Sequence, residues 1–318
     1  MKKILIIMPS FYGYEKKIQE CYEKQGYFVD IIRENFYSVI LKYKIISKLF
    51  FINKDRLFYY YYIKNIDISK KYDDIVVIRG SSVTKKVMEY VKSIFPDAKY
   101  HMYQWDSVQN NPNALRINKY FDTIQTFDMK DAEKFGWSYR PLFFINEAER
   151  TDRKILFSYI CVNHSDRIKI LNLIKEKFKD KPIYIYFYIG ALDYFVTKYI
   201  KRNANLLRIN KSDLYFHPLP VETANDIMSN CDIIVDYTNP NQDGFSMRTI
   251  EAMGNRCKLI TNNRNIKDAD FYNSNNIYIY DINDFSIPNE FLKHNYEEID
   301  SNVRNNYSLS TWCMELIG

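Results

Sequence analysis

Short apolar runs alternate with helical patterns along the whole chain. Residues 3–8 read Lys-Ile-Leu-Ile-Ile-Met, and similar runs occur at 74–78 and 232–236. Between such runs, apolar residues recur at the spacing of one helix face, as in 18–22. Because parallel strands are joined by crossover helices that cover both faces of the sheet, this alternation predicts an α/β fold with parallel sheets.

The boundaries of the expected elements follow from the apolar runs and from the turn residues between them. Strands are predicted at 3–8, 27–32, 74–78, 99–104, 123–126, 154–160, 182–189, 214–216, 232–236, 258–261 and 277–280. Helices are predicted at 18–26, 165–178, 194–202, 223–229, 246–253 and 302–317. Another helix ends at Ile94, and Ser81 or Ser82 is expected to cap its start.

The chain is too long for one ordinary domain. It has 318 residues, whereas single domains usually have roughly 100–200. A polar, charged stretch at 146–153 marks the expected boundary. We therefore expect a first domain at 1–148 with an insert at about 36–72, a second at 149–300, and a closing helix at 301–318 that crosses back to the first domain.

Cysteine usage and hydropathy bound the class of protein. The five Cys residues are odd in number and widely spaced, so neither a disulfide framework nor a zinc site is expected. The N-terminal apolar run is too short for a signal peptide, and no stretch approaches the ~20 apolar residues of a membrane span. A reduced cytoplasmic protein is the expectation.

The stretch from Lys42 to Lys71 is basic and aromatic. It carries eight Lys and Arg residues against two Asp, with Phe, Tyr, Leu and Ile between them. Such a surface suits anionic lipid headgroups, which would place the protein at the inner face of the cell membrane. One or two core helices with a solvated basic face explain the pattern equally well. Nucleic acid is not expected as a partner, because no recognition motif accompanies the charge.

The segment 237–254 carries the most chemistry. It is a loop after an apolar run that opens a helix near Gly244 and Ser246. Free N–H groups and the helix dipole at such a point favour a diphosphate, and Arg248 can add a charge-assisted bond. Glu251 lies three residues on, on the same side of the helix, where it can accept hydrogen bonds from ribose hydroxyls. The alternative is an ordinary capped helix with a surface Arg–Glu pair.

This segment resembles a known family. Asp243 and Glu251 have seven residues between them, and Gly-Phe and Glu-Ala-Met-Gly occur in the same stretch. The pattern is similar to the acidic-x7-Glu motif of GT-B glycosyltransferases. The runs Tyr-Gln-Trp-Asp-Ser at 103–107 and Lys-Leu-Ile-Thr-Asn-Asn at 258–263 look like those of bacterial capsule and lipopolysaccharide transferases. The resemblance implies two Rossmann-like domains facing across a cleft, with a nucleotide-sugar donor in the second.

The resemblance also implies which residues form the donor site. They come from three loops of the second domain: His164, Arg167, His217, Leu219, Gly244, Phe245, Ser246, Met247, Arg248 and Glu251. Glu251 would bind the ribose, the 244–246 backbone would face the diphosphate or sugar, and Asp243 would touch the sugar. Asp stands there where the family more usually has Glu.

The resemblance further implies contacts to the nucleobase and to the phosphates. His217 and Leu219 fall where family members hold the nucleobase through backbone groups. His164 and Arg167 lie in a loop from which a basic residue often reaches the phosphates. A surface or capping role is the alternative for His164.

Asp106 is the candidate on the acceptor side, because it follows a predicted strand of the first domain. An inverting enzyme would use it to take the proton from the acceptor hydroxyl, and a retaining enzyme would use it to position the acceptor. A turn or helix-capping Asp is the alternative.

No cofactor and no metal are expected. Asp268-Ala-Asp270 could be read as a metal-binding Asp-x-Asp, but it comes after the donor loop and lacks a preceding apolar strand.

These features together predict a retaining, metal-independent glycosyltransferase of surface polysaccharide synthesis that uses a saccharide or lipid-linked saccharide acceptor. The alternatives are a non-catalytic nucleotide- or sugar-binding protein and a nucleotide-sugar epimerase.

Overall fold

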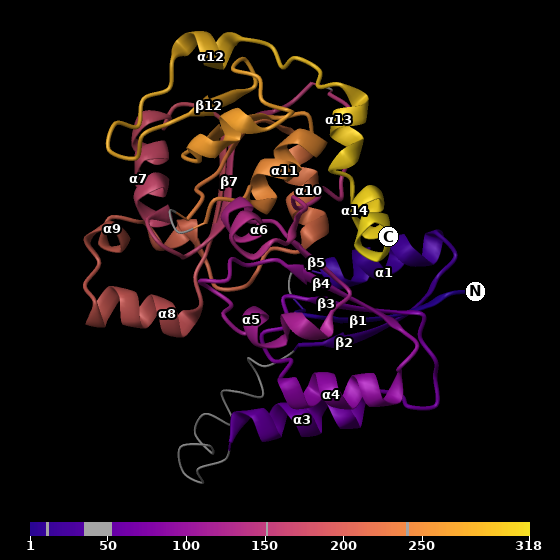
Figure 1. The fold of residues 1–318 in the computed structure, drawn as a ribbon. Helices are drawn as coiled ribbons and strands as arrows, with labels where there is room; N and C mark the ends of the chain where they lie inside the picture. The colour runs from indigo at the N-terminus through magenta and orange to yellow at the C-terminus, as the bar shows by residue number, and fades with distance from the viewer. Residues whose placement is uncertain (11–12, 35–52, 151, 240–241) are drawn as a thin grey trace. The chain divides into compact units, whose positions relative to one another are not determined.

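The computed structural model describes residues 1–10, 13–34, 53–150, 152–239 and 242–318 (Figure 1). The chain forms two compact units. The first contains Met1–Leu142 together with Leu309–Gly318, and the second contains Phe143–Ser308. The division expected between residues 148 and 149 falls inside the second unit, near its start.

The first unit is built on a six-stranded parallel sheet with the order β2-β1-β3-β4-β5-β6. Its strands are β1 (Lys3–Met8), β2 (Phe28–Arg33), β3 (Asp74–Ile78), β4 (Lys99–Gln104), β5 (Thr123–Thr126) and β6 (Ser138–Tyr139). All residues of β3 and the last five of β1 are buried. Continuous apolar runs are what strands covered on both faces require.

Helices cover both faces of this sheet (Figure 1). They are α1 (Tyr14–Lys24), α3 (Lys54–Asn65), α4 (Lys85–Ile94), α5 (Ala114–Ile117), α6 (Met129–Phe135) and α14 (Leu309–Ile317), with the 3-10 turn η1 (Asn118–Tyr120). Leu5 of β1 shares a buried cluster with Tyr62 of α3 and Val87 of α4. On the other face, the ring of Tyr103 in β4 meets that of Trp312 in α14 at 4.8 Å.

The helix that ends at Ile94 does not begin as predicted. Thr84 caps α4, because its hydroxyl accepts a hydrogen bond from the Val87 amide at 3.4 Å. The prediction of Ser81 or Ser82 was wrong. The Ser82 hydroxyl is within hydrogen-bond distance of Glu34 and Tyr62 instead, at 2.9 and 2.7 Å.

The C-terminal helix belongs to the first unit, as expected. Trp312 of α14 is fully buried, and the Tyr22 hydroxyl of α1 donates to the carbonyl of Cys313 at 2.7 Å. The single tail helix predicted at 302–317 is two helices, however, because a break at Tyr307 and Ser308 separates α13 (Ser301–Asn306) from α14.

The second unit repeats the architecture with the strand order β12-β11-β10-β7-β8-β9, again all parallel. Its strands are β7 (Ile155–Val162), β8 (Ile183–Tyr188), β9 (Leu214–Tyr215), β10 (Cys231–Val235), β11 (Lys258–Thr261) and β12 (Ile277–Ile279). Its helices are α7 (Arg167–Lys177), α8 (Ala191–Phe195), α9 (Ala204–Leu207), α10 (Val221–Ser229), α11 (Met247–Gly254), α12 (Asn289–Lys293) and α13, with the short turns η2 (Val196–Ile200), η3 (Lys211–Asp213) and η4 (Arg264–Asp268). The predicted α/β fold with two parallel sheets is confirmed.

The state of the cysteines and the hydropathy of the helices can be compared with the expectations from the sequence. All five Cys residues lie in the described part of the chain and are free thiols. Among the described helices, none is both long enough and apolar enough to cross a bilayer.

Gly254 ends α11 in a place where no other residue fits. A Cβ atom there would lie 2.5 Å from Cγ of Phe144 and 2.6 Å from the carbonyl oxygen of Asn146. The Gly254 carbonyl also accepts a hydrogen bond from the Ala148 amide at 3.2 Å. The glycine of the Glu-Ala-Met-Gly run is therefore required by the close approach of segment 144–148.

We predict that Gly254→Ala destabilises the second unit, because the added methyl group must push this segment away from α11. Overpacking of this kind costs about 1–3 kcal/mol. Urea denaturation followed by circular dichroism measures the change. Gly190→Ala is the matched control, since a Cβ at Gly190 meets nothing within 4 Å. Equal unfolding midpoints for the two variants would contradict the explanation.

Candidate active site

The helix α11 begins where the sequence predicted it. Ser246 is its N-cap, and the Ser246 hydroxyl accepts a hydrogen bond from the Thr249 amide at 3.1 Å. The preceding Gly244 and Phe245 are buried. The first amides of any helix lack intrahelical partners. The structure thus places a helix N-terminus, approached by a glycine, at the end of the loop that follows β10.

Arg248 and Glu251 form an ion pair on the first turns of this helix. The Nη1 atom of Arg248 lies 2.7 Å from Oε2 of Glu251. Glu251 is only 4% exposed, and Arg248 is half-buried. The pair is therefore not the surface pair of the alternative interpretation. Removing two charges from water is costly, so such a pair is an unusual feature of a short helix.

Asp236 links three elements of the second unit through hydrogen bonds, and the sequence did not identify it as a functional residue. Its buried carboxylate lies within hydrogen-bond distance of the hydroxyls of Thr238, Thr249 and Thr261, at 2.9, 3.5 and 3.4 Å. These threonines come from the loop after β10, from α11 and from β11. The only sequence signal was an acidic residue at the end of an apolar run, where it was taken as part of the strand.

Two asparagines that follow β11 hold the loop between β10 and α11. Asn262 accepts a hydrogen bond from the Thr238 amide at 2.7 Å and donates one to the Thr238 carbonyl at 3.0 Å. Asn263 donates to the carbonyl of Gly244 at 3.3 Å. The Thr-Asn-Asn run therefore positions the backbone of the predicted donor loop.

The acidic residues of this region have partners of their own. The side-chain amide of Asn265 donates to a carboxylate oxygen of Asp243 at 3.1 Å. Asp270 accepts a hydrogen bond from the Tyr307 hydroxyl at 2.6 Å, while Asp268 ends the short turn η4. In the described residues, no group of three or more His, Cys, Asp or Glu side chains is arranged to hold a metal ion.

The loop between β7 and α7 brings Arg167 to the loop that follows β10. The Arg167 guanidinium donates to the carbonyl of Tyr237 at 3.2 Å and to that of Val162 at 3.5 Å. His164 is exposed, and its Nδ1 lies 2.7 Å from the hydroxyl of Ser165. The phosphate contacts implied for His164 and Arg167 remain predictions.

His217 and Leu219 precede α10 in the second unit. The His217 carbonyl accepts a hydrogen bond from the Tyr186 hydroxyl at 2.9 Å, and the ring of Tyr186 stacks on that of Tyr215 at 3.9 Å. The His217 side chain is exposed, and Leu219 is half-buried. Their contact with a nucleobase remains a prediction.

In the first unit, Asp106 pairs with a strained arginine. Arg79 follows β3 and has a φ of 67°, a left-handed conformation that is uncommon for a residue other than glycine. Its Nε atom lies 2.7 Å from Oδ2 of Asp106, which follows β4 and is half-buried. The ion pair therefore joins the carboxyl ends of two neighbouring strands, the edge where a doubly wound sheet binds ligands.

Glu34 lies at the same edge and was also missed from the sequence. It directly follows β2, is buried, and accepts hydrogen bonds from the Ser82 amide and hydroxyl at 3.1 and 2.9 Å. Burial raises the pKa of this carboxyl, although the bonds from Ser82 and the nearby Arg79 charge act in the opposite direction. No local pattern marked Glu34, because its partner lies 48 residues away.

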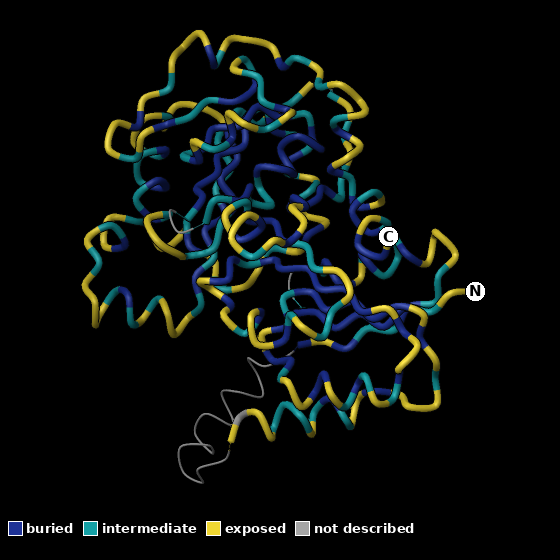
Figure 2. The backbone as a smooth tube through the Cα atoms, viewed as in Figure 1, coloured by how far each residue is buried: buried dark blue, intermediate teal, exposed yellow. Residues whose placement is uncertain are grey.

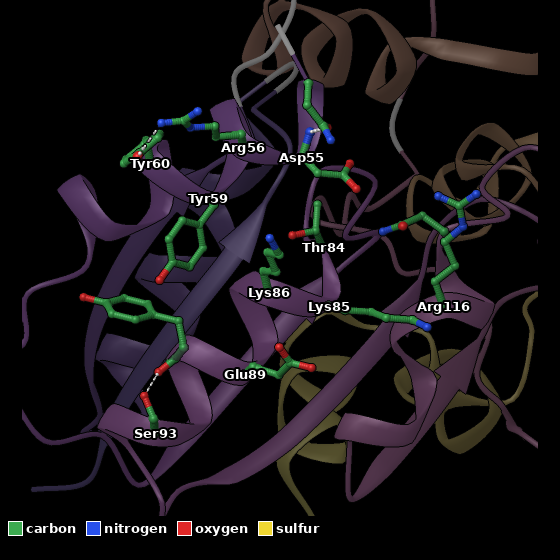
Figure 3. Close-up of a pocket in the computed structure, with 13 residues that line it drawn as sticks. Asp55, Arg56, Tyr59, Tyr60, Thr84, Lys85, Lys86, Glu89, Ser93 and Arg116 are labelled. Carbon is green, nitrogen blue, oxygen red and sulfur yellow. Dashed lines mark hydrogen bonds between the residues drawn. The ribbon is translucent and has the colours of Figure 1, made fainter.

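A groove of about 1250 Å³ lies elsewhere, between α3 and α4 (Figure 3). Its lining is polar and mixed in charge: Asn53, Asp55, Arg56, Tyr59, Tyr60, Thr84, Lys85, Lys86, Glu89, Tyr90, Ser93, Asn113 and Arg116. It contains none of the predicted donor residues.

The basic and aromatic stretch can be followed only in part. From residue 53 onward it forms α3, which buries Tyr62 and is followed by the buried Ile66, so this part contributes to the core of the first unit. Contact of its basic residues with a membrane remains a prediction. Lys42, Lys44 and Lys48 lie outside the described residues.

Comparison with known proteins shows that several solved structures have a similar fold. No protein-family model matches the chain, and no curated protein sequence matches it. An alpha-glucosyltransferase solved with UDP and a mismatched 13-mer DNA aligns with a TM-score of 0.57 at 13% identity, over 99% of this chain and 98% of that one. HepE from Anabaena, solved with UDP-glucose, gives 0.57 at 11% over the same shares.

A third similar structure is the sucrose-phosphate synthase of Thermosynechococcus elongatus, with a TM-score of 0.56 at 10% identity over 99% of this chain and 97% of that one. At these identities the likeness shows the fold. It is the α/β fold with two Rossmann-like domains that GT-B glycosyltransferases share, as the sequence predicted.

We predict that Glu34 makes stability fall as pH rises. The folded-state pKa of Glu34 is raised above the usual glutamate value of 4.5, so the folded chain binds more protons than the unfolded chain above that pH. The stability that Glu34 contributes to the folded chain is fully present below pH 4.5 and is lost as pH rises through the folded-state pKa of this carboxyl. Glu34→Gln should therefore raise the melting temperature more at pH 7.5 than at pH 4.5.

Differential scanning calorimetry at both pH values tests this expectation. Glu176→Gln, which removes a charge from an exposed position of α7, is the control. A Glu34→Gln variant whose melting temperature changes equally at both pH values would contradict the account of Glu34.

Proposed function

We propose that this chain is a glycosyltransferase that moves a hexosyl group from a nucleotide-diphosphate sugar to a saccharide or lipid-linked saccharide acceptor in surface polysaccharide synthesis. The reaction proceeds with retention and needs no metal. The observation that carries the proposal is the buried Glu251, paired with Arg248 at 2.7 Å on the first turns of α11. The similar structures solved with UDP or UDP-glucose support it.

The donor nucleotide binds at the start of α11. Its diphosphate accepts hydrogen bonds from backbone amides at the start of the helix, and the helix dipole favours its negative charge. Arg248 lies beside this point and adds a charge-assisted bond, while Glu251 accepts hydrogen bonds from the ribose hydroxyls. The bonds from Asn262 and Asn263 hold the loop in place before the nucleotide arrives.

The chemistry needs stabilisation of the leaving group. The bond between the anomeric carbon and the diphosphate oxygen breaks, and its electron pair stays on the diphosphate. The acceptor oxygen forms the new bond to the anomeric carbon on the face that the diphosphate leaves, which retains the configuration. The proton of the acceptor hydroxyl passes to the departing diphosphate oxygen. Arg248 and the N-terminus of α11 supply positive potential where the charge develops. We therefore propose that protein groups do this work without a metal ion.

Asp243 and Asp106 complete the proposed machinery. Asp243 contacts the donor sugar, with its carboxylate oriented by Asn265. Asp106 is already committed to an ion pair with Arg79, so we assign it to positioning the acceptor hydroxyl rather than to removing its proton. This role agrees with a retaining reaction.

The proposed location is the cytoplasm, with contact to the inner face of the membrane through the basic stretch from Lys42 to Lys71. Five basic residues of this stretch lie in the described part of the chain: Lys54, Arg56, Lys64, Lys70 and Lys71. Two functions of other classes remain as alternatives: a nucleotide- or sugar-binding protein without catalysis, and a nucleotide-sugar epimerase.

The first test is a panel of UDP-, GDP-, CMP- and dTDP-sugars with an oligosaccharide acceptor, scored by release of free nucleoside diphosphate or monophosphate. We predict release from one donor class. Glu251→Gln should weaken nucleotide binding by roughly 10- to 100-fold, the value of one or two hydrogen bonds to a charged group. Isothermal titration calorimetry measures the binding.

Glu222→Gln on the exposed first turn of α10 is the matched control and should bind normally. Binding without release identifies the non-catalytic alternative, and a changed sugar without release identifies the epimerase. If no donor binds or reacts, the transferase proposal is wrong.

The second test concerns the acceptor. Asp106→Asn should lower kcat/KM for the acceptor by about tenfold or more, because a charged hydrogen bond is worth roughly 1.5–3 kcal/mol. Donor affinity should stay unchanged. Asp97→Asn, at an exposed position just before β4, serves as the control. Normal acceptor kinetics in Asp106→Asn would remove this residue from the mechanism.

A further inference from the structure

An apolar surface is concentrated on one part of the second unit. Of the eleven large hydrophobic side chains exposed in the described residues, six lie between Leu192 and Tyr215. We call five of them the α8–α9 patch: Leu192, Phe195, Tyr199, Ile200 and Leu207, which are 71, 53, 57, 67 and 56% exposed. Single exposed apolar residues are ordinary, but a group of this size marks an interaction site.

The helical segment presents its apolar side outward. Leu192, Phe195, Tyr199 and Ile200 follow the i, i+3, i+7, i+8 spacing of one helix face. The buried position of the same segment is the polar Thr197. Globular proteins normally place the apolar stripe of a helix toward the core. Figure 2 shows exposed residues along α8 and α9, so the unit itself does not cover this face.

A wide helical turn interrupts the segment. The Lys201 amide donates to the carbonyl of Val196 at 2.9 Å, five residues back, so η2 is a π-turn. Such turns are rare and occur frequently at functional sites. Its two exposed apolar residues, Tyr199 and Ile200, belong to the patch.

The stretch of chain that carries the α8–α9 patch has an excess of basic residues. Residues 190–213 contain five basic side chains: Lys198, Lys201, Arg202, Arg208 and Lys211. The two acidic residues of this stretch are bonded to neighbours. Asn163 donates to Asp193 at 2.6 Å, and Lys175 forms an ion pair with Asp213. Basic residues therefore outnumber acidic ones by five to two along the stretch that forms the patch and its rim, and one of the two acidic residues is paired with a lysine.

Apolar and aromatic side chains with Lys and Arg beside them are the composition of a surface that lies in a bilayer interface. We propose that the α8–α9 patch is a membrane-contact surface that inserts its apolar side chains among the headgroups of an anionic lipid bilayer. Lys201, Arg202 and Arg208 then contact lipid phosphates. A second copy of the chain fits less well, since it would bring two cationic rims together and leave them unpaired.

This surface is distinct from the stretch between Lys42 and Lys71, and its existence does not depend on the proposed transferase activity. It consists entirely of described residues of the second unit. If the acceptor is lipid-linked, the patch would hold the donor-binding unit at the surface where the acceptor lies.

The test is co-sedimentation of the full chain with vesicles of phosphatidylcholine alone or mixed with phosphatidylglycerol. Wild type should bind the anionic vesicles. Leu192→Ser/Phe195→Ser/Ile200→Ser should bind at least about tenfold more weakly, and Lys201→Glu/Arg202→Glu should lose the preference for anionic lipid. The substituted positions are exposed, and unchanged circular dichroism and melting temperature would show that the variants fold.

Matched controls separate the patch from general effects. Leu115→Ser changes an exposed apolar residue of the first unit, and Lys179→Glu/Lys181→Glu reverses two exposed charges near the end of α7. Both should bind like wild type. Tyr199→Trp adds a reporter whose fluorescence should shift to shorter wavelength with anionic vesicles only.

Each remaining outcome counts against the proposal. If the triple serine variant binds like wild type, the patch does not contact membrane, even if Lys42→Glu/Lys44→Glu/Lys48→Glu abolishes binding. If wild type ignores vesicles but self-associates through the patch in analytical ultracentrifugation, the occupant is a second copy. If the Tyr199→Trp emission does not shift while the protein sediments, another surface carries the contact.

Discussion

Parallel strand pairing is the constraint on which the rest of the molecule depends. Both sheets are entirely parallel, so crossover helices must cover both faces and the strands must be apolar on both sides. Most strand residues are therefore apolar, although a few buried polar ones such as His101 and Lys258 find partners, and many polar groups gather where the strands end. In the second unit this edge holds Asp236 and the asparagines that follow β11, and in the first unit it holds Glu34 and the pair of Arg79 with Asp106.

The edge of the second unit is held in place by its own hydrogen bonds. Asp236 lies within hydrogen-bond distance of three threonine hydroxyls from three elements. Asn262 and Asn263 hold the backbone of the loop that leads to α11. Gly254 at the other end of α11 lets segment 144–148 pack closely against it. The helix α11 is thus held in place at both of its ends. A preorganised helix start suits the binding of a flexible diphosphate, because binding then costs little conformational entropy of the protein.

The sequence predicted the parts of this fold that depend on local pattern. The apolar runs predicted most strands to within a residue or two. The start of α11 near Ser246, the placement of Arg248 and Glu251 on one side of that helix, and the return of the C-terminal helix to the first unit were also predicted correctly. The two-residue strand β6 has no pattern long enough to detect.

Asp236, Glu34 and the Thr84 cap were missed because their significance comes from partners or competing bonds that depend on the folded structure. The outward face of α8 could not be foreseen either, since periodicity defines an apolar face without saying which way it points.

The central claim is that Glu251 and the start of α11 hold a nucleotide. A crystal structure of the protein with the nucleoside diphosphate that binds most tightly tests this claim most directly. The account predicts ribose hydroxyls within hydrogen-bond distance of Glu251 and a diphosphate at the first turn of α11, beside Arg248. A nucleotide bound in the groove between α3 and α4, or at any place away from Glu251, would contradict it.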